Sequence, residues 1–346
     1  MIRTDTPTAA LVGTGMVADM HVAAVAGTQG SVRLKGVYSR TPASALAFAE
    51  RHGLLTYESI EAVAADDEID FVILATPPDA RAELIRPIVA GRKPILMEKP
   101  VERDLSRARG IVEACEAAHV PLGVLFQHRM RPAAKELARR LEDGVLGQIA
   151  TVDVRVPWWR DQGYYDSPGR GTYDRDGGGV LITQAIHTLD LTLQLCGPVT
   201  DVQAMTRTSA LHSLEAEDFA SAAVAFDSGA AGALMASTTN FPGASESIVL
   251  NGTKGSAALS SNSLTIWLHD GRTEVLGAPA ATGGGADPMA FSSHWHQAVI
   301  EDFADALRND RSPVITGRSA LPVHALIDAI QMSSRTGSRC TPEPVG

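Results

Sequence analysis

Three short segments of this 346-residue chain carry side chains suited to chemistry, and each lies beside a run of apolar residues. The first is Gly13-Thr14-Gly15-Met16-Val17-Ala18, which follows the apolar run Ala9–Val12. The second is Glu98-Lys99-Pro100, which follows Ile95-Leu96-Met97. The third is Gly177-Gly178-Gly179, which leads into a helical pattern that carries His187.

The first segment matches G-x-G-x-x-G/A, the fingerprint of a dinucleotide site. Its first glycine permits a tight turn, and its second lets the backbone approach a pyrophosphate. The small Ala18 allows the following helix to pack closely, and the start of that helix holds the anion. We therefore expect an NAD or NADP site whose turn is made of Gly13, Thr14, Gly15, Met16 and Val17.

The second strand ends at Tyr38 and is followed by Ser39-Arg40, without the carboxylate that usually accepts a hydrogen bond from the ribose of NAD. A serine and an arginine at this place suit a 2′-phosphate. We therefore predict that NADP is preferred over NAD. Ser39 capping the next turn, with Arg40 over the adenine, is an alternative compatible with NAD.

Two further segments end strands at the edge of the sheet where ligands bind. Thr76-Pro77 follows Asp70–Ala75, and Glu98-Lys99 follows Ile95–Met97, so all four residues are expected beside the cofactor. A lysine there can hydrogen-bond a substrate hydroxyl and stabilise the negative charge that develops as hydride leaves. Lys99 is accordingly a predicted catalytic residue.

His187 is the predicted general acid and base, because the pKa of histidine lies near neutrality. Thr183 lies four residues earlier and shares its helix face. Asp190, three residues later, could orient the ring or stabilise the structure nearby. The preceding glycines are expected to let a ligand approach closely.

The pattern of the whole chain predicts an α/β fold with two domains. Short apolar strands alternate with helical patterns from about residue 8 to 126, which indicates a doubly wound parallel Rossmann sheet. Residues 127–346 contain a helix at Pro132–Leu141, several strands between Val199 and Val275, and two closing helices, which indicates an α/β domain with a large, mostly antiparallel sheet. Gly277–Ala286 is small and expected to be a mobile loop.

Composition excludes several other classes of protein. A net charge of -10 and no basic stripe argue against nucleic-acid binding. No run reaches the roughly 18 apolar residues of a membrane span, and the start of the chain leaves no room for a signal peptide. Three separated cysteines fit a reducing compartment, so a cytoplasmic location is expected. His294-Trp295-His296 has no evident third ligand and is interpreted as a helix start with exposed histidines, so no metal is predicted.

The glycine turn, Glu98-Lys99-Pro100 and the Gly-Gly-Gly…His187-x-x-Asp190 run together resemble the Gfo/Idh/MocA oxidoreductases, over nearly the whole chain. The resemblance implies catalysis by Lys99 and His187 and a homodimer or homotetramer formed through the open sheet of the second domain. One departure is Thr183, where many members carry an aspartate, so a proton relay must run through His187, Lys99 or the substrate hydroxyl.

The segment from Trp158 to Tyr173 resembles the substrate loop of sugar dehydrogenases in that family, with aromatic rings for a pyranose and Arg160 or Arg170 for a carboxylate or phosphate. Predicted substrate contacts are Arg129, Trp159, Arg160, Tyr165 and Thr183. The expected activity is hydride transfer between a nicotinamide and a secondary alcohol or ketone of a sugar, sugar acid or cyclic polyol. The alternatives are a dehydrogenase of aromatic-derived cis-dihydrodiols and a non-catalytic regulatory protein.

Overall fold

The computed structural model describes residues 6–285 and 291–346, and the chain divides into two compact units. Unit 1 contains residues 1–102, 106–127 and 293–320, and unit 2 contains residues 103–105, 128–292 and 321–346. Residues 103–105 are a short excursion into unit 2, and the chain then leaves unit 1 after residue 127, one residue beyond the predicted boundary of 126/127. The return of residues 293–320 to unit 1 differs from the single C-terminal domain expected from the sequence.

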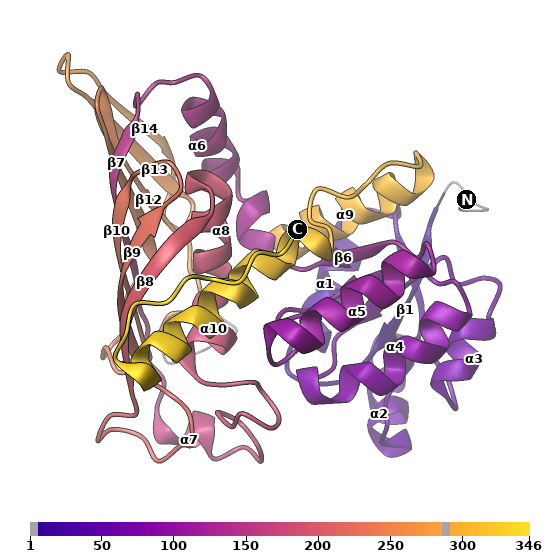
Figure 1. The fold of residues 1–346 in the computed structure, drawn as a ribbon. Helices are drawn as coiled ribbons and strands as arrows, with labels where there is room; N and C mark the ends of the chain where they lie inside the picture. Colours follow the sequence, from indigo (N-terminus) through magenta and orange to yellow (C-terminus); the bar gives the residue numbers. More distant parts are fainter. Residues whose placement is uncertain (1–5, 286–290) are drawn as a thin grey trace. The chain divides into compact units, whose positions relative to one another are not determined.

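Unit 1 is built on a six-stranded parallel sheet with the strand order β3-β2-β1-β4-β5-β6 (Figure 1). The four residues of β4 and all five of β1 are buried, as expected of strands covered on both faces. The predicted doubly wound parallel fold is thus confirmed. The strands are β1 Thr8–Val12, β2 Arg33–Tyr38, β3 Leu55–Thr56, β4 Phe71–Leu74, β5 Ile95–Met97 and β6 Leu122–Val124.

Helices connect these strands as right-handed crossovers require. The helices are α1 Ala18–Gly27, α2 Pro42–His52, α3 Ile60–Ala65, α4 Arg81–Ala90 and α5 Leu105–Ala117, with the 3-10 turn η1 Pro78–Ala80 before α4. The sequence pattern missed β3 and α3, because a two-residue strand and a six-residue helix are too short to show a period.

Helix α9 (His294–Arg308) belongs to unit 1 because its apolar face packs on α1 and the sheet. The ring of Phe303 meets that of Phe71 edge to face at 5.5 Å. Gly123 of β6 leaves room for Phe303, since a Cβ at Gly123 would lie 2.7 Å from the Phe303 ring. Beyond α9, Thr316 forms an antiparallel bridge with Gly123, and the 3-10 turn η4 (Arg318–Ala320) follows.

Unit 2 contains an eight-stranded sheet with the order β14-β13-β12-β11-β7-β10-β9-β8. Every pair is antiparallel except β7 and β10, which confirms the predicted, mostly antiparallel sheet. The strands are β7 Ile149–Pro157, β8 Val199–Arg207, β9 Phe219–Phe226, β10 Ala231–Ser237, β11 Ser247–Gly252, β12 Gly255–Ser260, β13 Ser263–Leu268 and β14 Thr273–Gly277.

Helices α6 (Pro132–Glu142), α8 (Ile186–Cys196) and α10 (Leu321–Thr336) all cover one face of this sheet (Figure 1). Side chains along β9 alternate between that buried face and an open one. No described helix of unit 2 covers the open face. The remaining short elements are α7 (Gln162–Tyr165), the 3-10 turn η2 (Gln127–Met130) and the π-helical turn η3 (Leu181–Ala185).

Among residues 6–285 and 291–346, every helix is too short or too polar to cross a lipid bilayer.

Candidate active site

The glycine turn after β1 has the backbone that a dinucleotide site needs. Gly13 has φ +110°, and a Cβ there would lie 2.7 Å from the carbonyl oxygen of Ala75 on the neighbouring strand. The same residue donates its N–H to the carbonyl oxygen of Tyr38 at 2.8 Å, which fixes the turn against β2. At Gly15, by contrast, a Cβ would meet nothing within 4 Å. The chain therefore leaves open the space that a pyrophosphate would occupy.

Ser39 and Arg40 follow β2 beside this turn. The hydroxyl of Thr14 donates to Ser39 Oγ at 3.2 Å, so the two segments are joined by their side chains. Arg40 is exposed, and Met16 is 47% exposed. The residues predicted for the cofactor from β1 and β2 thus lie together, and none of their functional groups is buried in the core.

Glu98 lies in a buried cluster at the end of β5. Its Oε1 is 2.9 Å from Nε2 of His21 on α1 and 3.7 Å from Nε2 of His296 on α9. Its Oε2 accepts the backbone N–H of Lys99 at 3.2 Å. The carboxylate therefore holds the peptide unit that carries the predicted catalytic lysine, a role that the sequence had not assigned to it. The peptide bond between Lys99 and Pro100 is cis.

The cluster shifts two pKa values in the same direction for different reasons. Burial alone would raise the pKa of Glu98, but the hydrogen bond with His21 and the neighbouring charges lower it to about 2. Burial lowers the pKa of His296 to about 4, against an opposing effect of Glu98. At neutral pH the cluster thus holds an ionised Glu98 beside a neutral His296. The expectation of exposed histidines at this helix start is wrong for His296, which is 2% exposed.

Thr76 and Pro77 lie in the loop after β4, which ends at Leu74 and not at Thr76 as the sequence predicted, and this loop is fixed by a buried arginine. Arg81 donates to the Thr76 carbonyl oxygen at 2.8 and 3.2 Å and to the Val101 carbonyl oxygen at 3.3 Å. Burial lowers the pKa of Arg81 to about 10, although nearby carboxylates oppose the shift. Arg81 therefore links the two loops that carry Thr76 and Lys99.

In unit 2, His187 lies in the first turn of α8, directly after the π-helical turn η3. Single π-turns of this kind frequently occur at functional sites. His187 is 6% exposed, and its ring stacks on that of His128 with centroids 4.8 Å apart. The hydroxyl of Thr183 lies 2.5 Å from the carbonyl oxygen of Gly179, so it is engaged by the chain's own backbone.

The glycines before η3 make room for the chain itself. A Cβ at Gly177 would lie 2.5 Å from the carbonyl oxygen of Arg103, and one at Gly179 would lie 1.8 Å from that of Glu217. The Glu217 carboxylate also accepts the N–H groups of Gly179 and Leu181 at 3.3 and 3.1 Å. The expectation that these glycines admit a ligand is therefore wrong for Gly177 and Gly179.

Arg129 is a predicted substrate contact, but its side chain is used within unit 2. Its Nε and Nη2 donate to the two carboxylate oxygens of Asp190 at 2.7 and 2.5 Å, and both side chains are nearly buried. Burial raises the pKa of Asp190, and the charge of Arg129 opposes that shift. This pair fixes the helix that carries His187. Of the two roles that the sequence left open for Asp190, orienting His187 or stabilising the structure nearby, its contact with Arg129 favours the second.

Behind His128 lies a buried pair of charges that the sequence did not reveal. Nη1 of Arg131 is 2.6 Å from Glu246, and Nη2 of the same guanidinium contacts Nε2 of His128. Because arginine only donates, Nε2 of His128 is the acceptor and its proton lies on Nδ1. Arg131, which is paired with Glu246, therefore holds the ring that stacks on His187 in one orientation.

The loop after β7 differs from expectation at Arg160. This side chain is 2% exposed, and its terminal nitrogens donate to the carbonyl oxygens of Trp159, Gly283 and Gly285 at 2.6 to 2.7 Å. Its two terminal nitrogens are therefore not available to a substrate carboxylate. Arg160 instead holds residues 283–285, where the sequence predicted a mobile loop, and Ala286 lies outside the described residues.

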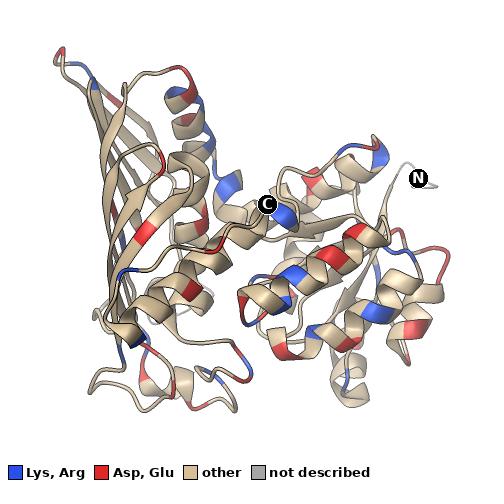
Figure 2. Ribbon diagram, in the orientation of Figure 1, with Lys and Arg blue, Asp and Glu red and all other residues tan. Residues whose placement is uncertain are grey.

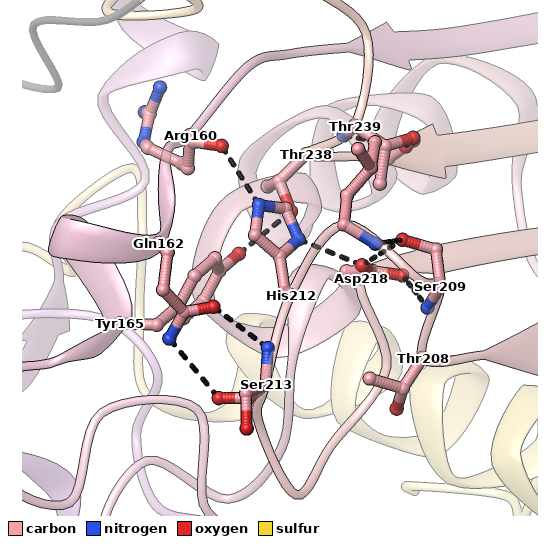
Figure 3. A network of polar contacts seen from close by, with 12 residues as sticks. Arg160, Gln162, Tyr165, Thr208, Ser209, His212, Ser213, Asp218, Thr238 and Thr239 are labelled. Atoms are coloured by element: carbon pink, nitrogen blue, oxygen red, sulfur yellow. Dashed lines mark hydrogen bonds and ion pairs between the residues drawn. The ribbon is translucent and has the colours of Figure 1, made fainter.

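Tyr165 is likewise buried, and its hydroxyl lies 2.7 Å from Thr238 Oγ1. Figure 3 shows Tyr165 beside a network centred on His212, whose Nδ1 is 2.8 Å from Asp218 and whose Nε2 is 2.9 Å from the Arg160 carbonyl oxygen. The prediction that Tyr165 contacts substrate is therefore not favoured. Trp159 remains half-exposed and meets the exposed ring of Phe241 edge to face at 5.4 Å.

Known proteins share this sequence and fold. Residues 8–126 match the oxidoreductase family with an NAD-binding Rossmann fold, and residues 134–258 match the Gfo/Idh/MocA C-terminal domain. The chain belongs to the Gfo/Idh/MocA family. It is thus an oxidoreductase with an NAD-binding domain, and the resemblance seen in its motifs is confirmed.

Three relatives of this Gfo/Idh/MocA protein are informative. Inositol 2-dehydrogenase of Rhizobium meliloti is 27% identical over 92% of this chain and 94% of its own length. D-apiose dehydrogenase of Paraburkholderia graminis is 27% identical over 81% of this chain and 75% of its own. The WlbA dehydrogenase of Chromobacterium violaceum, solved in complex with NADH and UDP-GlcNAcA, is 29% identical with a TM-score of 0.85, and the match covers 100% of this chain and 98% of that one.

The histidine in the Glu98 cluster makes this Gfo/Idh/MocA protein sensitive to acid. His296 takes up a proton near pH 4 in the folded protein and near its ordinary pKa of 6.5 in the unfolded chain. The unfolded chain binds more protons between these values, so the free energy of unfolding should fall by up to about 3 kcal/mol as pH falls from 6.5 to 4. Urea denaturation at several pH values measures the slope.

His296→Gln should flatten the pH dependence of unfolding in that window, because a neutral side chain replaces the group that takes up the proton. His294→Gln, a change to an exposed histidine on the same helix, serves as the control and should leave the slope as it is. An identical slope in wild type and His296→Gln would refute the assignment.

Proposed function

We propose that this protein is a dehydrogenase that oxidises a secondary alcohol of a sugar or cyclic polyol. The observation that carries the proposal is the combination of an open glycine turn with a buried carboxylate that holds the Lys99 peptide. The relatives named above act on inositol and apiose, which supports the same substrate class here.

When bound, a nicotinamide would supply the acceptor for the hydride that leaves the carbon carrying the hydroxyl, and the hydride donor in the reverse direction. Gly13 to Val17 hold the pyrophosphate, and Thr76, Pro77 and Glu98 line the cofactor. Lys99 donates a hydrogen bond to the substrate oxygen and stabilises its developing charge. His187 accepts the hydroxyl proton as the carbonyl forms, so a C–H and an O–H bond break together with formation of C=O.

Of the substrate contacts predicted from the sequence, Thr183 and Trp159 remain in this proposal. Thr183 carries no charge, so it cannot take the proton, and the proton task falls on His187 with help from Lys99. His128 stacks on His187 and acts as a positioning residue for it.

Lys99→Ala and His187→Ala should each lower turnover by about 10²- to 10⁴-fold, the usual contribution of a general acid or base. Binding of NADH, followed by its fluorescence, should change little, because neither side chain forms the glycine turn. The assay is reduced-nicotinamide absorbance with inositols, apiose and related sugars.

Lys254→Ala is the matched control for Lys99→Ala, since Lys254 is an exposed lysine between β11 and β12. Unchanged turnover in both active-site variants would defeat the mechanism. NADH binding without oxidation of any sugar, polyol or cis-dihydrodiol would favour a regulatory protein.

We further propose that NADP is preferred over NAD. Ser39 and Arg40 lie beside the glycine turn, where Thr14 joins them through Ser39. The exposed guanidinium of Arg40 suits a 2′-phosphate, and no carboxylate occupies positions 38–41 to receive the ribose hydroxyl of NAD.

Arg40→Ala should lower kcat/KM for NADP by about 10- to 100-fold, the value of one charged hydrogen bond, and should leave that for NAD nearly unchanged. Arg51→Ala is the control, because Arg51 is an exposed arginine paired with Asp19. A wild-type enzyme that prefers NAD, together with an unaffected Arg40→Ala variant, would overturn this proposal.

A second copy of the chain is the proposed partner of the open face of the unit 2 sheet. The pairing register brings one row of side chains across the whole face, formed by Gln203, Ala223, Ala233, Asp153, Val249, Ala258, Thr265 and Val275. Figure 2 shows charged residues chiefly on helices and turns, with few on these strands. Val275 and Trp267 are 68% and 46% exposed, and an uncovered apolar face of this kind favours association.

Ala223→Glu should convert the assembly to a smaller one, because it places a charge on β9 within the row of side chains that crosses this face. Light scattering after size-exclusion chromatography measures the mass. Ser228→Glu adds the same charge in the β9–β10 turn and should leave the mass as in wild type. A monomeric wild type would exclude the proposal.

We retain the cytoplasm as the proposed compartment. All three cysteines are free thiols in the structure, and burial raises the pKa of Cys115 to about 11 and that of Cys196 to about 12. Unreactive, unbonded thiols of this kind suit a reducing compartment.

A further inference from the structure

Three arginines lie in the segment between β7 and η3, and the structure gives them different surroundings. Arg160 donates its terminal nitrogens to three carbonyl oxygens and is buried. Arg175 contacts Asp176 at 3.5 Å and packs over Gly169, where a Cβ would lie 2.6 Å from its side chain. Both therefore have partners within the segment or beside it.

Arg170 has no such partner. Among the described residues, no carboxylate or carbonyl oxygen accepts a hydrogen bond from its side chain. Its Nε is buried without an acceptor, as are Nε of Arg160 and Nη1 of Arg175, but those two side chains have the other partners just described and Arg170 has none among the described residues. Its guanidinium lies over the ring of Tyr164, 4.3 Å from the centroid. A buried N–H without an acceptor costs on the order of 1–3 kcal/mol, so the site is more stable when an acceptor is bound.

A second guanidinium group lies near Arg170. Arg160 lies over the same ring, 5.3 Å from its centroid. Burial lowers the pKa of Arg160, Tyr164 and Tyr165 oppose that shift, and the nearby positive charge of Arg170 adds to it. Because the terminal nitrogens of Arg160 already donate to carbonyl oxygens, Arg170 is the one of the two cations that can pair with an anion.

Tyr164 connects Arg170 to the helix that carries His187. Its hydroxyl accepts a hydrogen bond from Gln184 Nε2 at 3.2 Å. Gln184 lies in the π-helical turn η3, next to Thr183 and three residues before His187. Thr183 and Gln184, which contact each other in this turn, both have uncharged side chains. A substrate held at His187 would therefore have Tyr164 and Arg170 on one side of it.

We propose that Arg170 and Tyr164 form an anion-binding subsite of the active site, so that the natural substrate is an acidic sugar or polyol. The inference rests on the proposed function of His187 and narrows its substrate class. The guanidinium pairs with the anionic group, and the Tyr164 ring supports the guanidinium from below by a cation–π contact. Either a carboxylate or a phosphate has the required chemistry, because both accept two parallel N–H groups.

The test compares three sugars that share one ring: D-glucose, D-glucuronate and D-glucose 6-phosphate. In wild type, kcat/KM should be about 10- to 100-fold higher for an anionic sugar than for D-glucose, as expected of one charged hydrogen-bonded pair. Preference between the last two identifies the anion as carboxylate or phosphate. In Arg170→Gln the advantage of the anionic sugar over D-glucose should disappear, because KM for the anionic sugar rises.

Arg175→Gln is the matched control, because it removes the same charge from the same segment at a residue that already has a partner. It should keep the preference for the anionic sugar. Arg160→Gln should melt lower than Arg170→Gln, because it loses hydrogen bonds to three carbonyl oxygens whereas Arg170→Gln loses none. A preference that survives in Arg170→Gln would overturn the inference.

Binding separates this inference from the proposed function. Isothermal titration calorimetry of the NADH-loaded protein with D-glucuronate and D-glucose 6-phosphate needs no turnover. Affinity that falls about tenfold or more in Arg170→Gln supports the subsite even if neither sugar is oxidised. Binding of neither anion, or binding that Arg170→Gln leaves unchanged, rejects the subsite, while oxidation of neutral polyols would still support the dehydrogenase.

Discussion

A buried guanidinium must give its N–H groups to acceptors, and this requirement organises the functional segments of both units. Arg81 holds the loops that end β4 and β5 by donating to backbone carbonyl oxygens. Arg131, paired with Glu246, contacts the His128 ring directly, and Arg129 fixes α8 through Asp190. Arg160 ties the loop after β7 to residues 283–285. Each predicted catalytic residue is thus held by an arginine that the reaction itself does not use.

The need of a buried guanidinium for acceptors also distinguishes arginines that stabilise the fold from arginines that can bind a ligand. Arg160 and Arg170 lie ten positions apart and contact the same tyrosine ring, yet one has three carbonyl acceptors and the other has none. Arg160 holds Trp159 in place, because it donates to the Trp159 carbonyl oxygen and to residues 283 and 285 of the neighbouring loop. Arg170 is the arginine that remains available for a ligand. A side chain that stabilises the fold is generally not free to stabilise a substrate, and the two tasks are divided here between two arginines.

The sequence predicted much of this architecture because its signals are local. Fewer than twenty residues suffice to recognise the glycine turn, each buried parallel strand and the helical period around His187. The structure has each of these features where the sequence predicted it. The Glu98 cluster could not be read that way, because His21 and His296 come from helices at opposite ends of the chain. Helix α9 joins unit 1 for the same reason: its partner surface is α1, and no local pattern in residues 293–320 records that.

The substrate segment shows where local reasoning fails. Tyr164 and Tyr165 are neighbours in one helical turn, so composition favours both equally, and only the fold decides that Tyr165 faces Thr238 and Tyr164 faces Gln184. Arg160 and Arg129 have the residue type of a substrate contact, but their acceptors lie 123 to 125 and 61 positions away. Long-range acceptors cannot be inferred from spacing. A single sequence therefore identifies which arginines and tyrosines compete for the substrate, and the tertiary hydrogen bonds determine which of them remain available to it.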